Sequence, residues 1–161
     1  MLTAARLREI LHYDPDTGAF TWRVSRKGVR AGAAAGTLCQ GYYRIMADRR
    51  SYQAHRLAWL YMTGAWPEAE IDHINLARAD NCWCNLREAT RVENQRNTSA
   101  RPNNTSGFKG VVWHKSAKRW RATITADGKQ CHLGYFDTPQ AAAAAYADAA
   151  KKLFGEFARA S

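Results

Sequence analysis

The chain has 161 residues and an ordinary apolar content of 46%, which suits one compact domain or two small ones. Its 24 Lys and Arg residues exceed its 14 Asp and Glu residues, so the net charge is +10. Residues 1–100 carry 14 basic and 10 acidic side chains, whereas residues 101–161 carry 10 and 4. Such an excess attracts polyanions, so nucleic acid is the expected class of partner, ahead of an anionic membrane surface.

The sequence argues against a membrane protein and against a secreted one. No apolar run approaches the ~20 residues of a membrane-spanning helix, and charges occupy the N-terminus where a signal peptide would be apolar. The spacing of Cys39, Cys82, Cys84 and Cys131 fits neither a disulfide framework nor a usual zinc site. We therefore expect four reduced thiols, no membrane association and a cytoplasmic location.

The first half of the chain predicts a small unit of mixed helix and strand. Residues 3–12 have the apolar spacing of a short helix, and residues 14–18 have the composition of a turn. Apolar and aromatic runs at 20–24 and 42–46 predict a small antiparallel sheet. Residues 54–63 predict a helix that ends at a glycine.

The second half begins with a linker and continues as sheet and helix. Residues 98–106 are small, polar and contain proline, as expected of a linker. Residues 119–125 alternate between polar and apolar, which predicts a half-buried strand, and Asp-Gly at 127–128 predicts a hairpin turn. Thr138 and Pro139 have the order of an N-cap and a first helical residue. The apolar stripe of that helix is predicted to comprise Ala142, Ala145, Tyr146, Ala149 and Leu153.

Residues 70–97 are polar and rich in Asn, with side chains that bind rather than pack. They combine an adjacent Asp72 and His73, an Asn-Leu-Arg element and a later Asn94. Thr90 with a Glu three residues on has the pattern of a capping box, which predicts a helix start just before Asn94. Together with residues from 54 onward, this combination resembles the HNH family of endonucleases.

The HNH resemblance implies a ββα-metal core at about 69–97, in which a hairpin carries the Asp-His pair and a helix crosses it. The implied catalytic residues are His73 and Asn85, and the implied metal ligands are Asp72 and Asn94. In this scheme His73 takes a proton from water while Asn85 holds its ring. The oxygen ligands suit Mg²⁺ or Mn²⁺. Asn97 remains an alternative ligand to Asn94, and His55 is expected to be structural rather than catalytic.

Residues 106–156 contain four short motifs, at 108–113, 120–124, 133–138 and 141–146. Together these motifs resemble the APETALA/ethylene-response-factor type of DNA-binding domain. The resemblance implies a three-stranded antiparallel sheet backed by one helix, with the open sheet face in the major groove of DNA. The alternation at 119–125 itself predicts that Arg119, Arg121 and Thr123 point away from the helix. Arg suits guanine edges, and the lysines before the strand suit phosphate. The expected DNA-binding residues are Lys109, His114, Lys115, Lys118, Arg119, Arg121, Thr123 and His132.

The sequence therefore predicts an α+β protein with an HNH domain at 1–97, a linker at 98–106 and a sheet module at 107–161. We expect a metal-dependent endonuclease of homing type that cuts double-stranded DNA in the cytoplasm, that of a bacterial host if a phage encodes it. The alternative is a sequence-specific DNA-binding regulator with an inactive HNH unit, and an RNA-binding module is a third reading. The target sequence, the number of strands cut and the oligomeric state stay open, with a monomer slightly favoured.

Overall fold

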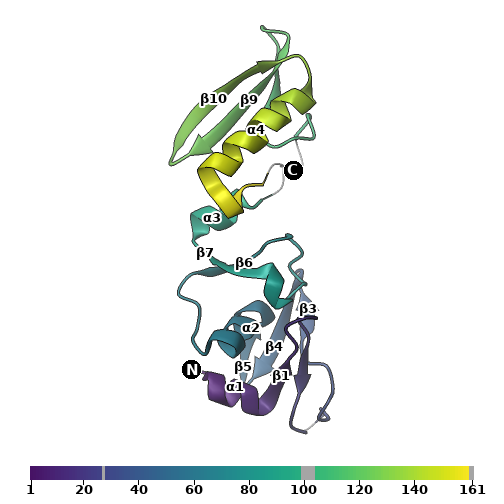
Figure 1. Cartoon of the computed structure of the whole chain (residues 1–161). Coiled ribbons are helices and arrows are strands. Elements are labelled where there is room, and N and C mark those ends of the chain that lie inside the picture. Colours follow the sequence, from purple (N-terminus) through teal and green to yellow (C-terminus); the bar gives the residue numbers. More distant parts are fainter. Residues whose placement is uncertain (27, 99–103, 160–161) are drawn as a thin grey trace. The chain divides into compact units, whose positions relative to one another are not determined.

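A computed structural model describes residues 1–26, 28–98 and 104–159 of the chain. They form two compact units, Met1–Arg91 and Val92–Ser161 (Figure 1). Both units combine helices with small antiparallel sheets, which confirms the α+β class. In the described part of the chain, no helix is long and apolar enough to cross a membrane. Residues 99–103, most of the predicted linker, lie outside the described residues.

The first unit contains three helical segments and seven short strands among its described residues. They are α1 (Ala4–Ile10), β1 (Leu11–Tyr13), β2 (Phe20–Trp22), β3 (Thr37–Cys39), β4 (Tyr42–Ala47), β5 (Arg50–Gln53), α2 (Ala54–Thr63), β6 (Glu70–His73), the 3-10 turn η1 (Trp83–Asn85) and β7 (Leu86–Ala89). The strands pair as β1-β2, β3-β4-β5 and β6-β7, all antiparallel.

The first helix is shorter than predicted. It ends at Ile10, and the chain extends from Leu11 so that β1 pairs with β2. Extension places Leu11 and Tyr13 on one face of the strand, where both are buried. The apolar spacing of residues 3–12 therefore belongs partly to a strand of period two, which a short window does not separate from a helix.

Helix α2 packs on the three-stranded sheet and forms the centre of the first core. It spans Ala54–Thr63, as predicted, and Gly64 ends it in the left-handed conformation with φ of 83°. Its buried Leu57 and Leu60 belong to one cluster with Ile45 of β4. This core holds β5 and the start of α2 in place, and so it fixes the position of His55.

A long loop connects the two strands of the β6-β7 hairpin, and the turn at residues 14–18 supports this loop. Trp83 donates its backbone N–H to the carbonyl of Pro15 over 2.8 Å, and the Tyr13 hydroxyl donates to the carbonyl of Asn81 over 2.7 Å. Gly18 has φ of +70°, and a Cβ atom there would lie 2.3 Å from the carbonyl carbon of Asn81. The turn can approach the loop this closely only because residue 18 has no side chain.

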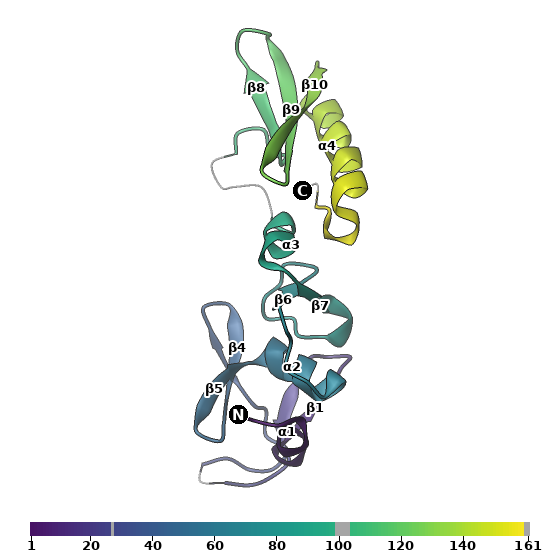
Figure 2. The same cartoon turned by 90° about the vertical axis from the view of Figure 1, so that its left-hand side faces the viewer.

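The second unit is a three-stranded sheet with a long helix on one face. Its elements are α3 (Arg91–Arg96, whose first residue falls in the first unit), β8 (Val111–His114), β9 (Arg119–Ala126), β10 (Lys129–Phe136), α4 (Pro139–Phe154) and η2 (Gly155–Phe157). The strand order is β10-β9-β8. Figures 1 and 2 show α4 along one face of this sheet, and among the described residues no helix of this unit lies on the opposite face.

Helix α4 begins as predicted, but its apolar stripe ends differently. The Thr138 hydroxyl accepts a hydrogen bond from the N–H of Ala141 over 3.2 Å, and Pro139 follows as the first helical residue. Leu153 was predicted to be buried, yet it is 50% exposed, and Phe154 packs on the core instead. The buried residues of α4 are Ala142, Tyr146 and Ala150. Their spacing of four leads to position 154 rather than 153.

Candidate active site and nucleic-acid interface

Asp72 and Arg87 form a buried ion pair across the β6-β7 hairpin. They are direct cross-strand partners, and Oδ2 of Asp72 accepts from Nε of Arg87 over 3.0 Å and from Nη2 over 2.8 Å. The two side chains are 3% and 12% exposed. The sequence places Arg87 in the Asn-Leu-Arg element but predicts no role for it. Its position opposite Asp72 in the predicted hairpin is the sequence feature that could have indicated this ion pair.

His73 ends β6 and is 5% exposed. Its ring centroid lies 5.0 Å from that of His55 at an interplanar angle of 85°, and 6.0 Å from that of Tyr42. Burial lowers the pKa of His73, and this effect is partly opposed by the Asn81 side chain and by the charge of Asp72. At neutral pH the imidazole is therefore uncharged and able to accept a proton.

Asn85 orders the loop between the two strands. Its Oδ1 accepts from the N–H of Asn75 over 2.9 Å, and its Nδ2 donates to the carbonyl of Asp80 over 2.8 Å. The HNH resemblance implies that Asn85 holds the His73 ring, whereas both of these hydrogen bonds go to the loop backbone.

His55 forms one wall of the same cluster. It is 5% exposed, and its ring centroid lies 5.4 Å from that of Tyr42. Burial, followed by the charges of His73 and Arg56, lowers the pKa of His55 to about 3. Its buried Nδ1 has no hydrogen-bond partner among the described residues. A ring that stays neutral throughout the physiological range adds no charge that would repel a proton on His73.

The remaining predicted ligand, Asn94, lies on α3 in the second unit. It is half-buried, whereas its alternative Asn97 is 4% exposed and follows the last residue of α3. Within the described residues, no three His, Cys, Asp or Glu side chains gather as a closed metal site. The oxygen donors of Asp72 and Asn94 suit a cation that keeps much of its water, as Mg²⁺ does.

The open face of the second sheet is arranged as the alternation predicted. Arg121 in the middle strand pairs with Val112 on one side and Tyr135 on the other. Thr123 pairs with His132, and the ring of His132 lies 4.8 Å from that of Tyr135. The opposite face carries the residues predicted to meet the helix. Ala122 and Ile124 are buried there, with Trp120 and Leu133 packed against the same clusters.

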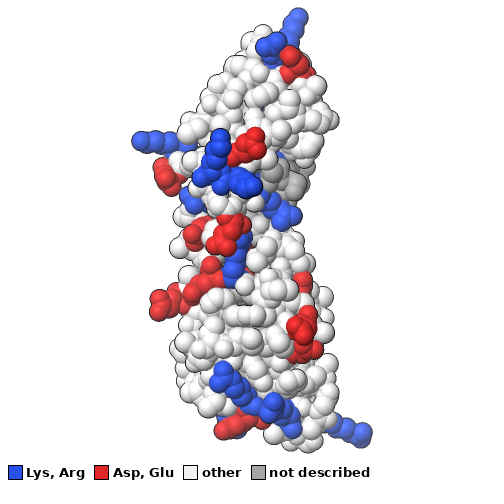
Figure 3. All heavy atoms as spheres, viewed as in Figure 1, with Lys and Arg blue, Asp and Glu red and all other residues white. Residues whose placement is uncertain are grey.

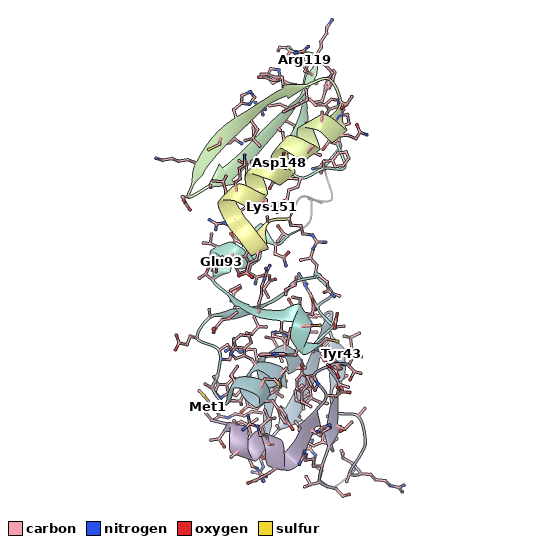
Figure 4. The ribbon with its side chains drawn as sticks, viewed as in Figure 1. Met1, Tyr43, Glu93, Arg119, Asp148 and Lys151 are labelled. Carbon is pink, nitrogen blue, oxygen red and sulfur yellow. The ribbon has the colours of Figure 1, made fainter. Side chains whose placement is uncertain are left out.

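Several predicted DNA-binding residues already have protein partners. Arg119 forms an ion pair with Asp137 at 3.0 Å, and Nδ1 of His114 accepts from the N–H of Ala117 over 3.1 Å. Basic and acidic atoms meet at the tip of the second unit in Figure 3, in the region where Figure 4 labels Arg119. The ammonium of Lys109 donates to two backbone carbonyls. Lys115 and Lys118, in contrast, are exposed.

Two family models match this chain in separate segments. Residues 52–96 match the HNH endonuclease model, and residues 106–156 match the AP2 domain model. An AP2-like ethylene-responsive transcription factor of Arabidopsis thaliana is 45% identical over 51 residues, which are 32% of this chain and 10% of that protein.

Viral relatives match a larger part of the chain. Protein 3.8 of Escherichia phage T7 is 37% identical over 106 residues, which are 65% of this chain and 87% of the relative. An uncharacterized HNH endonuclease of Acanthamoeba polyphaga mimivirus is 32% identical over 118 residues, which are 72% of this chain and 60% of the relative. A solved structure of the HNH homing endonuclease I-HmuI superposes with a TM-score of 0.43 at 19% identity, covering 84% and 76% of the two chains. The chain belongs to the HNH endonuclease family, and it is a DNA endonuclease that also carries an AP2 domain.

Proposed function

We propose that this endonuclease hydrolyses phosphodiester bonds of double-stranded DNA with one divalent cation, and that it is of the homing type. The domains would be the HNH nuclease at 1–97, a linker at 98–106 and the AP2 module at 107–161. The observation that carries the proposal is the buried ring of His73 directly beside the buried carboxylate of Asp72, and burial lowers the pKa of His73. The four free cysteines and the T7 relative support action in the cytoplasm of a bacterial host.

His73 would act as the general base of the reaction. Attack on a phosphodiester requires that water lose a proton, and a neutral imidazole accepts one at physiological pH. The same burial that lowers its pKa keeps the ring in its basic form and restricts its motion between His55 and Tyr42. The proton that His73 gains is returned to solvent before the next cycle.

Asp72 and Asn94 would hold Mg²⁺ or Mn²⁺ through oxygen atoms. A bound cation supplies a positive charge beside the phosphoryl oxygens and the leaving oxygen. Arg87 would orient the Asp72 carboxylate, because its two N–H donors fix one of the two carboxylate oxygens. Asn85 would keep the loop after His73 closed by its two backbone hydrogen bonds.

Supercoiled-plasmid cleavage with and without Mg²⁺ or Mn²⁺ tests this function. We expect cleavage that a chelator abolishes, and we expect His73→Ala to be slower by about 10²–10⁴-fold. His12→Ala is the matched control, since His12 is an exposed histidine of the same unit. Duplex binding should survive in His73→Ala. Full activity in that variant would contradict the assignment. Binding without any cleavage in the unaltered protein would favour the regulator with an inactive HNH unit.

The AP2 module would read DNA through its open sheet face. Arg121 lies in the central strand, where a major-groove reader makes base contacts, and its buried Nε has no protein partner in the described part of the chain. Lys118 lies in the exposed turn before that strand, where phosphates are nearer.

Binding titrations on a specific and a scrambled duplex at several salt concentrations separate the two roles. Arg121→Ala should cost about 1–3 kcal/mol on the best site and relax sequence preference. Lys118→Ala should weaken both duplexes equally and lower the salt slope by about one. Equal weakening of both duplexes by Arg121→Ala would mean that the sheet grips phosphate and that sequence is read elsewhere.

A further inference from the structure

Helix α3, which carries the proposed ligand Asn94, has no buried apolar face. It has six residues, Arg91–Arg96, and none of them is buried. Isolated helices shorter than about 12 residues are marginal in water, and most helical stability in proteins comes from packing an apolar face. Val92, its one large apolar residue, is 56% exposed. Polar contacts, those at its C-terminal end among them, therefore set the position of α3.

The contacts at its C-terminal end come from the AP2 part of the second unit. The guanidinium of Arg96 forms an ion pair with Asp127 of the β9-β10 turn at 3.3 Å, and its carbon lies 4.5 Å from the ring centroid of Phe154 at the end of α4. The ammonium of Lys109 donates to the carbonyl of Arg96 over 2.7 Å and to that of Thr98 over 2.9 Å. A cation at the C-terminal carbonyls of a helix also interacts favourably with the partial negative charge of the helix dipole at that end.

The contact consists of a few long side chains and is not a packed interface. A groove of about 990 Å³ runs between α3 and the sheet. Its lining includes Gln95, Arg96, Lys109, Asp127, Tyr146 and Phe154. Because side chains bridge this groove, removing one of them should loosen the C-terminal end of the helix without leaving a cavity in a core. Burial lowers the pKa of Lys109, which indicates that its head group is partly withdrawn from water.

We propose that the AP2 module is a working part of the nuclease, because Lys109 and Arg96 position α3 and with it the Asn94 side chain. The two residues are positioning residues and touch neither metal nor substrate. Lys109 thereby has a structural task in place of the DNA contact expected from its charge. The inference rests on the proposed function of Asn94 as a metal ligand.

The test uses full-length variants and two readouts, the Mn²⁺ concentration for half-maximal cleavage and duplex affinity in chelator. Lys109→Met should raise the half-maximal Mn²⁺ concentration by about 10-fold, the lower end for loss of a group that orients a ligand, and leave duplex affinity within about twofold. Arg96→Met should act in the same direction, and Lys109→Arg should retain most of the metal affinity. Lys151→Met is the matched control, because Lys151 is an exposed lysine of α4 (Figure 4) and should change neither readout.

Loss of duplex affinity in Lys109→Met with an unchanged Mn²⁺ requirement would mean that Lys109 contacts DNA, and it would overturn the proposal. Hydrogen exchange of the α3 amides separates this inference from the proposed function. Faster exchange in Lys109→Met supports the positioning role, and unchanged exchange in both Met variants refutes it. Asn94→Ala with an unchanged Mn²⁺ requirement would instead show that the ligand assignment is wrong.

Discussion

Removal of Arg87 should show how strongly the stability of the first unit depends on the ion pair between Arg87 and Asp72. In Arg87→Met the carboxylate of Asp72, 3% exposed, would lose two charge-assisted donors at 2.8 and 3.0 Å. Breaking a buried ion pair from one side costs about 3–5 kcal/mol, and we expect about 3 kcal/mol because Arg87 keeps some access to water. For a unit of this size, that loss lowers its melting temperature by about 12–24 °C.

A double-mutant cycle separates the pair from simple loss of packing. Asp72→Asn removes the charge that Arg87 neutralises, so the double variant should be more stable than the sum of the two single losses predicts, by about 2 kcal/mol. Urea unfolding followed by tryptophan fluorescence gives each free energy, with Lys151→Met as a control for a lost surface cation. Strict additivity of the two substitutions, or a loss below about 1 kcal/mol in Arg87→Met, would refute the reasoning.

Three further perturbations test other parts of the structure. Burial lowers the pKa of His55 from about 6.5 in the unfolded chain to about 3 in the folded protein. The contribution of His55 to the free energy of unfolding is therefore complete above pH 6.5, and it should fall by about 1.4 kcal/mol per pH unit as the pH drops from 6.5 to 3. Acid unfolding of His55→Phe should lack this slope, and an identical slope would contradict the assignment. Gly18→Ala should cost more than about 1 kcal/mol in urea unfolding and slow cleavage, because its Cβ meets Asn81 at 2.3 Å; wild-type behaviour would mean that the turn yields. Thr138→Ala should cost about 1 kcal/mol by thermal unfolding and Thr138→Ser much less, and equal losses would argue against the cap.

The elements that the sequence predicts best are those with a local physical signal. Helix α2 has a full apolar period and a terminal glycine, and both of its bounds agree with the prediction. The turn at 127–128 has positive φ at both residues, 50° and 76°, as Asp-Gly pairs allow. The cap at Thr138 likewise needs only its own neighbours. These features require no knowledge of distant residues.

What the sequence could not supply depends on tertiary partners. The pairing of β1 with β2 decides that Leu11 extends, and the phase of α4 on the sheet decides that Phe154 rather than Leu153 is buried. The AP2-type resemblance implied DNA contacts for Lys109 and His114, and each of them also has a protein partner, which the sequence did not indicate. The site residues Asp72 and His73 were predictable as a pair because adjacency is local. Their roles toward metal and water remain predictions.

The support that residues 14–18 give to the loop at 80–83 has a consequence for the order of folding. The two segments are separated by more than 60 positions, so their contact closes a long loop of chain. Closing that loop costs conformational entropy before the contact contributes to stability. We therefore expect the loop after His73 to take its final shape after the N-terminal helix and sheets have assembled. We also expect that residues 52–96, which match the HNH endonuclease model, do not fold on their own. A fragment that begins there would keep every named site residue of the nuclease and still lack the turn that supports their loop.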